Sequence, residues 1–240
     1  MQRIIVSDES KGIEIVGKKI YKFVDQKTVL FLSGGSTPKL LYQKFASEKI
    51  LKPGAVAMVD ERYGNPFHQN SNEKMIRETG FLSYLEEKKI PFYSILRLHP
   101  KGVASDIARD YDKAVRDLFN KFQKRVAILG IGSDGHTAGL PAGKSQITPA
   151  SPSEAGRANL KSQKLATSFE DFPGESKERI SLTFDALSKM NLLMVQVFGK
   201  EKRKALKLLF SEGSIAEVPA RFLKTPFITD RTLLITDQRV

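Results

Sequence analysis

The stretch VLFLSGGSTPKLLY at residues 29–42 decides the fold class of this chain. Its start belongs to an apolar run over 28–33, as expected of a strand buried on both faces of a sheet. Two glycines, a serine and a threonine follow, and the next residues predict a helix over 38–47 with Pro38 at its first position. A buried strand, a tight turn and a helix form a βα unit, so the stretch predicts a parallel sheet covered by helices.

The same alternation of apolar runs and helical patterns continues on both sides of this stretch. Strands are predicted over 3–7, 55–60, 93–98, 125–132, 178–184, 192–199 and 233–237, the last at an edge of the sheet. Helices are predicted over 10–25, 71–85, 103–122 and 200–210, with a bend near Gly80. We therefore expect one α/β domain over 1–240, with an open, mostly parallel, Rossmann-like sheet and helices on both faces.

Residues 139–176 interrupt this pattern. They are rich in Gly, Pro, Ser and Lys and contain no convincing long element. The segment predicts a loop-rich excursion, which is either a lid or an irregular connection.

Composition excludes several classes of protein. With 240 residues and 40% hydrophobic residues, the chain can bury a substantial core and is not generally disordered. No apolar run reaches the roughly 18 residues needed to cross a bilayer, and the polar turn after the first few residues is unlike a secretory signal. Cysteine is absent, which excludes disulfide and thiol chemistry and fits a reducing compartment. We expect a cytoplasmic protein without a membrane partner.

The formal net charge of +12 indicates either an anionic partner or a lysine-rich solvated surface. The basic residues are spread along the chain, which favours the second interpretation. Their densest cluster, at 199–210, has apolar residues at helical spacing, so its lysines are predicted on an exposed helix face. Aromatic residues are not interleaved with these lysines as a base-stacking platform requires, and we expect no nucleic-acid partner.

The turn after the first buried strand has the residues of an anion site. Gly34 and Gly35 allow the backbone to approach a ligand closely, and the following helix offers free N–H groups and a positive dipole end. Ser36 and Thr37 add hydroxyl donors. The spacing matches neither a Walker loop nor a dinucleotide fingerprint. The motif predicts a phosphate cradle, and the alternative is an ordinary turn with a Ser or Thr cap.

Two further strand ends carry polar residues. Asp60, Glu61 and Arg62 follow the apolar run at 55–59, and Asp134 and His136 lie in the glycine-rich loop LGIGSDGHTAG at 129–139. Ligands of open parallel sheets bind beyond the carboxyl ends of the strands, so these residues are predicted at the same rim as the cradle. A capped helix with a surface ion pair is the alternative for the first group, and a structural histidine for the second.

A histidine in such a loop suits proton transfer. His136 can take a proton from water near neutral pH, and a carboxylate at Asp134 could fix its tautomer. Metal binding is not expected, because the three histidines are scattered, cysteine is absent and no H-E-x-x-H spacing occurs. A serine triad is not expected, since no G-x-S-x-G elbow occurs.

Six motifs together resemble the 6-phosphogluconolactonase family and follow its order over about residues 29–206. They are LSGGSTPKLLY, VDER, HQNSN, LGIGSDGHTAG, ERISLT and FGKEKRKAL. The wider superfamily includes glucosamine-6-phosphate deaminases, which share the phosphate corner and the D-G-H loop. The lactonases typically read Asp-Glu-Arg at 60–62, as here, where deaminases usually have an aromatic third residue. Deaminases also place a glutamate five residues after the histidine, where this chain has Pro141. Both positions favour a lactonase.

The resemblance implies hydrolysis of 6-phosphoglucono-δ-lactone to 6-phosphogluconate, in the oxidative pentose phosphate pathway. His136 would be the general base and Asp134 would position the loop or the imidazole. Arg179 and Lys202 match basic residues of the superfamily that look like phosphate ligands. Without the resemblance, both residues would be interpreted as ordinary surface charges. Asp60 and Arg62 would complete the binding site, with Arg62 a candidate for stabilising the oxyanion.

The resemblance also implies that Ser71 and Asn72 cap the next helix and shape the rim. It implies a small-molecule partner, a sugar-phosphate lactone, and no cofactor, because ester hydrolysis needs no electron sink. The expected assembly is a monomer or a weak homo-oligomer. The alternatives are a deaminase-like isomerase and a non-catalytic sugar-phosphate-binding protein.

One departure from the family concerns the pocket wall. Lactonases usually continue the D-G-H loop with Ser-Leu-Phe-Pro-Gly, whereas this chain has GLPAG at 139–143. The wall is therefore predicted to lack that phenylalanine, and residues 144–176 match the family poorly.

Overall fold

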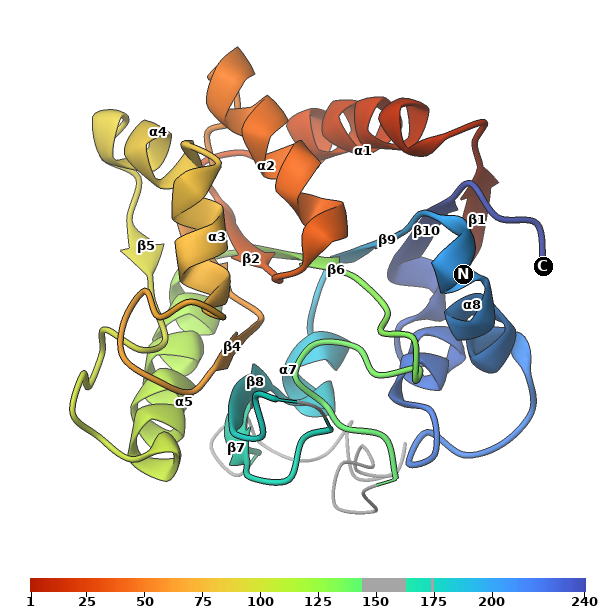
Figure 1. The fold of residues 1–240 in the computed structure, drawn as a ribbon. Coiled ribbons are helices and arrows are strands. Elements are labelled where there is room, and N and C mark those ends of the chain that lie inside the picture. Colours follow the sequence, from red (N-terminus) through yellow and green to blue (C-terminus); the bar gives the residue numbers. More distant parts are fainter. Residues whose placement is uncertain (144–162, 174) are drawn as a thin grey trace.

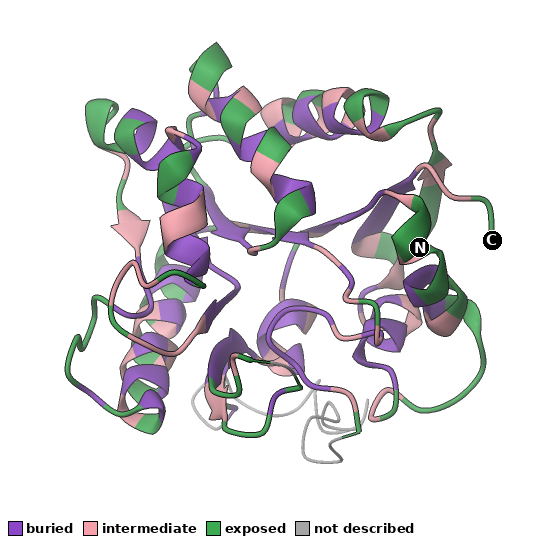
Figure 2. Cartoon of the chain, in the orientation of Figure 1, coloured by how far each residue is buried: buried purple, intermediate pink, exposed green. Residues whose placement is uncertain are grey.

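The computed structural model describes residues 1–143, 163–173 and 175–240. Its centre is a seven-stranded sheet in the order β1-β10-β9-β6-β2-β3-β5, and every pairing is parallel. In that order the strands are Gln2–Ile5, Thr232–Thr236, Leu192–Val197, Lys124–Leu129, Thr28–Leu32, Ala55–Met58 and Phe92–Tyr93. All residues of β2, β3 and β10 are buried, so the apolar runs do form strands covered on both faces (Figure 2).

Helices cover both faces of this sheet, which confirms the predicted α/β class. In Figure 1, α1 (Glu9–Phe23) and α2 (Ser36–Glu48) lie above the sheet, whereas α5 (Ala104–Lys121) and α7 (Phe184–Ser188) lie below it. The helix α8 (Arg203–Phe210) buries Ala205, Leu206 and Leu209 and exposes Lys204 and Lys207, as the spacing at 199–210 predicts. Within the described residues no helix is both long enough and apolar enough to span a membrane.

A second, smaller sheet corrects two predicted strands. The strand predicted over 55–60 ends at Met58, and β4 (Asp60–Arg62) instead pairs antiparallel with β8 (Arg179–Leu182), which pairs antiparallel with β7 (Ala166–Phe169). The strand predicted over 178–184 therefore belongs to this sheet and not to the central one. Apolar patterning predicts that a segment is extended but not which strand it will pair with, because pairing depends on residues distant in the sequence.

Three other predicted elements differ from the structure in their bounds or position. The helix predicted over 71–85 is two helices, α3 (Asn72–Glu78) and α4 (Phe81–Glu87), separated at Gly80, whose φ is +81°. The strand predicted over 93–98 is only the two-residue β5. The strand predicted at an edge near the C-terminus, β10, lies between β1 and β9, and β1 is the edge. The described residues also include the short 3-10 segments η2 (Lys200–Lys202), η3 (Pro219–Lys224) and η4 (Thr229–Arg231).

The helix α2 starts at Ser36, two residues earlier than predicted, so Pro38 is its third residue. Most of the predicted loop-rich excursion, and with it the question of a lid, lies outside the described residues. Its described part contains β7 and the segment that leads into β8.

The strand order creates a crevice between β2 and β6. The strands β2 and β6 are neighbours in the central sheet. The next strand of this sheet after β2 is β3, which lies on one side, and the next after β6 is β9, which lies on the other. The loops after β2 and β6 therefore separate and leave space above the carboxyl ends of the strands, where ligands of such sheets bind.

Candidate active site

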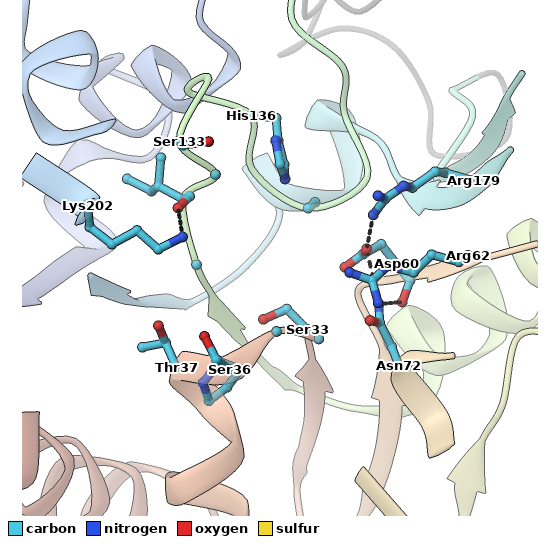
Figure 3. Close-up of a pocket in the computed structure, with 17 residues that line it drawn as sticks. Ser33, Ser36, Thr37, Asp60, Arg62, Asn72, Ser133, His136, Arg179 and Lys202 are labelled. Carbon is cyan, nitrogen blue, oxygen red and sulfur yellow. Dashed lines mark hydrogen bonds and ion pairs between the residues drawn. The ribbon is translucent and has the colours of Figure 1, made fainter. Parts of the chain in front are cut away.

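A pocket of about 290 Å³ occupies this crevice. Nine predicted site residues are among those that line it: Gly34, Gly35, Ser36, Thr37, Asp60, Arg62, His136, Arg179 and Lys202. Asp134 does not line the pocket but is bonded to His136. Figure 3 shows Ser36, Thr37 and Lys202 on one side and Asp60, Arg62, Asn72 and Arg179 on the other, with His136 between them. We call the first side the phosphate corner and the second side the facing wall.

The phosphate corner is the uncapped N-terminus of α2. Its N-cap residue is Gly35, at φ +101° and ψ 171°, a conformation that side chains other than glycine strongly disfavour. Glycine cannot cap the helix with a side chain, so the first N–H groups and the positive dipole end are available to an anion. Ser36 and Thr37 are the first two residues of the helix and bring their hydroxyls to the same place. The alternative of an ordinary Ser or Thr cap does not hold here.

Gly34 lines the pocket and also has a packing role. A Cβ at this position would lie 1.7 Å from Oδ1 of Asn72, so the missing side chain makes room for Asn72. Asn72 in turn donates from Nδ2 to the backbone oxygen of Asp60 at 2.9 Å. Gly34 is thus the point where the phosphate corner packs against the facing wall.

Lys202 adds a positive charge to the phosphate corner. It lies at the end of the short turn that follows β9, and its Nζ donates to the backbone oxygen of Ile131 at 3.1 Å. This bond fastens the ammonium group to the loop after β6. The charge therefore stays beside Ser36 and Thr37 at one end of the pocket (Figure 3).

His136 and Asp134 form a directly bonded pair. Nδ1 of His136 lies 2.5 Å from Oδ1 of Asp134, which also accepts the backbone N–H of His136 at 3.2 Å. The hydrogen bond from the imidazole lowers the pKa of Asp134 to about 2, so the carboxylate is ionised and only accepts. Nδ1 therefore carries the hydrogen of this bond, which leaves Nε2 as the imidazole nitrogen that is not engaged with Asp134.

The backbone of the loop holds the imidazole in place. A Cβ at Gly132 would lie 2.1 Å from Cε1 of His136, so only glycine leaves room for the ring. Gly132 also donates its N–H to the backbone oxygen of His136 at 2.9 Å, and Thr137 donates its hydroxyl to that of Gly130 at 3.0 Å. Gly132 thus makes room for the histidine itself.

The facing wall is built from β4, β8 and the start of α3. Nη1 of Arg179 lies 4.0 Å from Oδ2 of Asp60, and burial lowers the pKa of Arg179. Arg62, paired across the small sheet with Arg179, donates from Nη1 to the backbone oxygen of Asn70 at 2.8 Å. Two guanidinium groups therefore share this wall with one carboxylate.

Glu61 is not at the rim, contrary to prediction. It is fully buried and accepts four hydrogen bonds, from the backbone N–H groups of Arg62, Asn72 and Glu73 and from the hydroxyl of Ser71. Desolvation by burial raises its pKa to about 7. Ser71 caps α3 by accepting from the backbone of Lys74, as predicted. Glu61 thus joins β4 to α3 and fixes the direction of the two side chains beside it in the sequence.

Sequence reasoning missed two pocket-lining serines and one aromatic residue. Ser33 and Ser133 line the pocket beside residues that were predicted, and their position in the two glycine motifs was the signal available. Phe172 contacts both His136 and Arg179, and no pattern in its irregular segment indicates this. It places a phenyl ring beside the His136 imidazole, although the family's phenylalanine after the D-G-H loop is missing from this sequence.

The other two histidines, His68 and His99, do not line the pocket. Nε2 of His68 lies 3.0 Å from the backbone oxygen of Arg62, and Nδ1 of His99 lies 3.3 Å from Oδ2 of Asp110. In the described part of the chain, His, Asp and Glu residues nowhere gather in a group of three or more that could hold a metal ion.

Known proteins resemble this chain over almost all of its length. A family model described as glucosamine-6-phosphate isomerases/6-phosphogluconolactonase matches residues 13–232. The 6-phosphogluconolactonase of Thermotoga maritima is 28% identical over 216 residues, which cover 88% of this chain and 87% of the relative. That of Synechocystis sp. is 29% identical over 204 residues, covering 80% and 76%.

Solved structures show the same fold. The structure of 6-phosphogluconolactonase from Plasmodium vivax matches with a TM-score of 0.74 at 20% identity, over 99% of this chain and 90% of that one. The structure from Thermotoga maritima matches with a TM-score of 0.70 at 23% identity, over 98% and 97%. From the extent of the family match, together with this fold, it follows that the chain belongs to the glucosamine-6-phosphate isomerase/6-phosphogluconolactonase family.

Proposed function

We propose that the protein hydrolyses 6-phosphoglucono-1,5-lactone to 6-phosphogluconate, a step of the oxidative pentose phosphate pathway. One observation carries this proposal: an imidazole bonded to an ionised carboxylate faces the same pocket as an uncapped helix N-terminus with a lysine. A substrate with a phosphate at one end and an ester at the other matches both groups. The lactonases among the relatives and the Asp-Glu-Arg sequence at 60–62 support this choice within the family.

The phosphate binds at the phosphate corner. Ser36, Thr37 and the first N–H groups of α2 donate hydrogen bonds, and Lys202 supplies a positive charge. Arg179, which the family resemblance also implies as a phosphate ligand, adds a second positive charge from the facing wall. Holding the phosphate fixes the distant carbonyl group, which converts binding energy into orientation of the reacting atoms.

His136 acts as the general base. Nε2 takes a proton from water as the water oxygen bonds to the carbonyl carbon, and Asp134 stabilises the imidazolium that forms. The carbonyl oxygen becomes negative, and Arg62 on the facing wall is our candidate for stabilising it. When the ring C–O bond breaks, the imidazolium returns the proton to the departing ring oxygen. One water is consumed, and the ring opens to a carboxylic acid and a hydroxyl group.

Replacing His136 tests the proposal directly. His136→Ala should lower turnover of fresh lactone by roughly 10²–10⁴-fold, the usual contribution of one general base. The assay is run at controlled pH and corrected for spontaneous opening of the lactone. His99→Ala is the matched control, because the His99 side chain is 47% exposed, does not line the pocket and lies beside Asp110 of α5. Unchanged turnover in His136→Ala would exclude this residue as the base.

The same assay separates the lactonase from a deaminase-like isomerase. A deaminase would release ammonia from glucosamine 6-phosphate, and Pro141 occupies the position where deaminases carry a glutamate. Ammonia release without lactone turnover would overturn the proposed function, and a protein that binds the sugar phosphate without turning it over would be a non-catalytic binder.

A further inference from the structure

Phe172 packs against two side chains that line the pocket, the imidazole of His136 and the guanidinium of Arg179. Its ring centroid is 5.0 Å from that of His136, with the ring planes at 83°. Cζ of Arg179 lies 4.0 Å from the centroid of the same phenyl ring. Phe172 is only 3% exposed, and its backbone N–H bonds to the oxygen of Lys177 at 2.8 Å in the turn that leads into β8.

The phenyl ring is the best-defined contact of the Arg179 guanidinium. Its polar contacts are long: Nε lies 3.4 Å from the backbone oxygen of Ser176, and Nη1 lies 4.0 Å from Oδ2 of Asp60. A guanidinium stacked on an aromatic face is attracted electrostatically and keeps its hydrogens pointing outward around the edge. The ring therefore orients the cation without using its donors.

The same ring completes a slot around the His136 imidazole. Asp134 fixes Nδ1, and the backbone of Gly132 packs so closely that no side chain fits there. Phe172 adds a third contact, with its ring nearly perpendicular to the imidazole, which restricts the tilt of the imidazole ring.

We propose that Phe172 is a positioning residue that aligns the His136 imidazole and the Arg179 guanidinium toward one substrate. This inference rests on the proposed function. It requires an aromatic ring, because a leucine of similar bulk keeps the site apolar but offers neither a flat face for stacking nor a fixed ring edge. An irregular segment remote from the D-G-H loop in sequence thus supplies this side of the pocket.

Three variants test whether the ring itself matters. Phe172→Leu should lower kcat/KM for the lactone by about 10-fold, within the range expected of coupled neighbours, with both a lower kcat and a higher KM. Phe172→Tyr keeps the ring and should recover most of that loss. Phe119→Leu is the matched control, because Phe119 is also buried and its ring centroid lies 5.2 Å from Cζ of Arg125, and neither residue lines the pocket. Wild-type kcat and KM in Phe172→Leu would overturn the inference.

A double-mutant cycle distinguishes positioning from simple packing. The loss caused by Phe172→Leu should shrink by about threefold or more when Arg179 is already leucine, because part of it passes through the guanidinium. Affinity for 6-phosphogluconate, measured by titration calorimetry, gives the same cycle without turnover. Equal losses in the two Arg179 backgrounds would reduce Phe172 to a packing residue and overturn the inference.

The two readouts keep the inference and the proposed function apart. A wild-type protein that binds 6-phosphogluconate but does not hydrolyse the lactone would overturn the proposed function, and the affinity cycle would still decide the role of Phe172. A wild-type protein that hydrolyses the lactone, with no coupling between Phe172 and Arg179, would overturn the inference alone. A protein that neither binds nor hydrolyses would overturn both.

Discussion

The phosphate corner and the facing wall line one pocket but are made in opposite ways. The phosphate corner is almost entirely one continuous stretch, in which β2, two glycines and the start of α2 follow each other within 28–38. The facing wall combines β4, α3 and β8, and its arginines are separated by more than a hundred residues of chain. The loop that carries His136 resembles the corner, since its two functional side chains are two residues apart.

This difference predicts how function and stability respond to substitution. In a locally built loop the side chains reach solvent and carry little of the fold, so a substitution should affect activity and leave stability nearly unchanged. In the facing wall the side chains are buried in contacts between distant segments, so the same kind of change should lower both. The expected effects follow from the largest to the smallest.

The largest effect is expected in the locally built loop. Asp134→Asn should lower kcat by roughly 10²–10⁴-fold, because an amide can donate to Nδ1 and move the imidazole hydrogen to Nε2. The Tm should change little, since the Asp134 side chain is 37% exposed. Because the pKa of Asp134 is lowered to about 2, the carboxylate stays ionised through the neutral range, so the loss should be present at every assay pH from 5 to 9. A large drop in Tm would contradict the separation of function from stability.

A matched pair of cations compares the two sides directly. Lys202→Ala and Arg179→Ala should each raise KM by about 10–100-fold, the value of a hydrogen bond to a charged group. Only Arg179→Ala should also lower the Tm, because the Arg179 side chain is 11% exposed and packs on Phe172. Steady-state kinetics and thermal unfolding of the two variants check this. If the two variants had the same Tm, the phosphate corner and the facing wall would not differ in their contribution to stability.

The smallest effect on turnover, with a clear effect on stability, is expected at Glu61. Glu61→Gln should cost about 1–3 kcal/mol in free energy of unfolding, since the amide NH2 group cannot accept from the backbone N–H groups that one carboxyl oxygen now faces. Turnover should fall only several-fold, through loss of order in Arg62.

Glu61 also predicts a dependence of stability on pH. Burial raises its pKa from 4.5 to about 7, so the folded state holds the proton more tightly than the unfolded state does. This contribution to stability is complete below pH 4.5 and is lost as the pH rises to about 7. The wild-type Tm should therefore decline across that window, and Glu61→Gln should not show the decline. Parallel profiles for the two proteins would exclude Glu61 as the cause.

The same contrast explains which predictions succeeded. The pairing of Asp134 with His136 and the helix N-terminus at Ser36 follow from neighbouring residues, because a strand end and a glycine turn restrict where the next side chains can point. The burial of Glu61 and the pairing of Arg62 with Arg179 depend on β8 leaving the central sheet, which its apolar pattern does not reveal. The prediction of β10 at an edge is wrong for the same reason, because its apolar pattern does not reveal that β1 pairs beside it.

The sequence by itself determined the parallel α/β class, the phosphate corner, the D-G-H loop and the family, because each depends on residues that are close together in the chain or on motifs in order. Only the tertiary structure decided which strands pair, that Glu61 is buried behind the wall, and that Phe172 contacts both His136 and Arg179. The physical reason is that hydrophobic burial, which drives the packing of distant segments, has no direction, so periodicity marks what will be buried without stating against what.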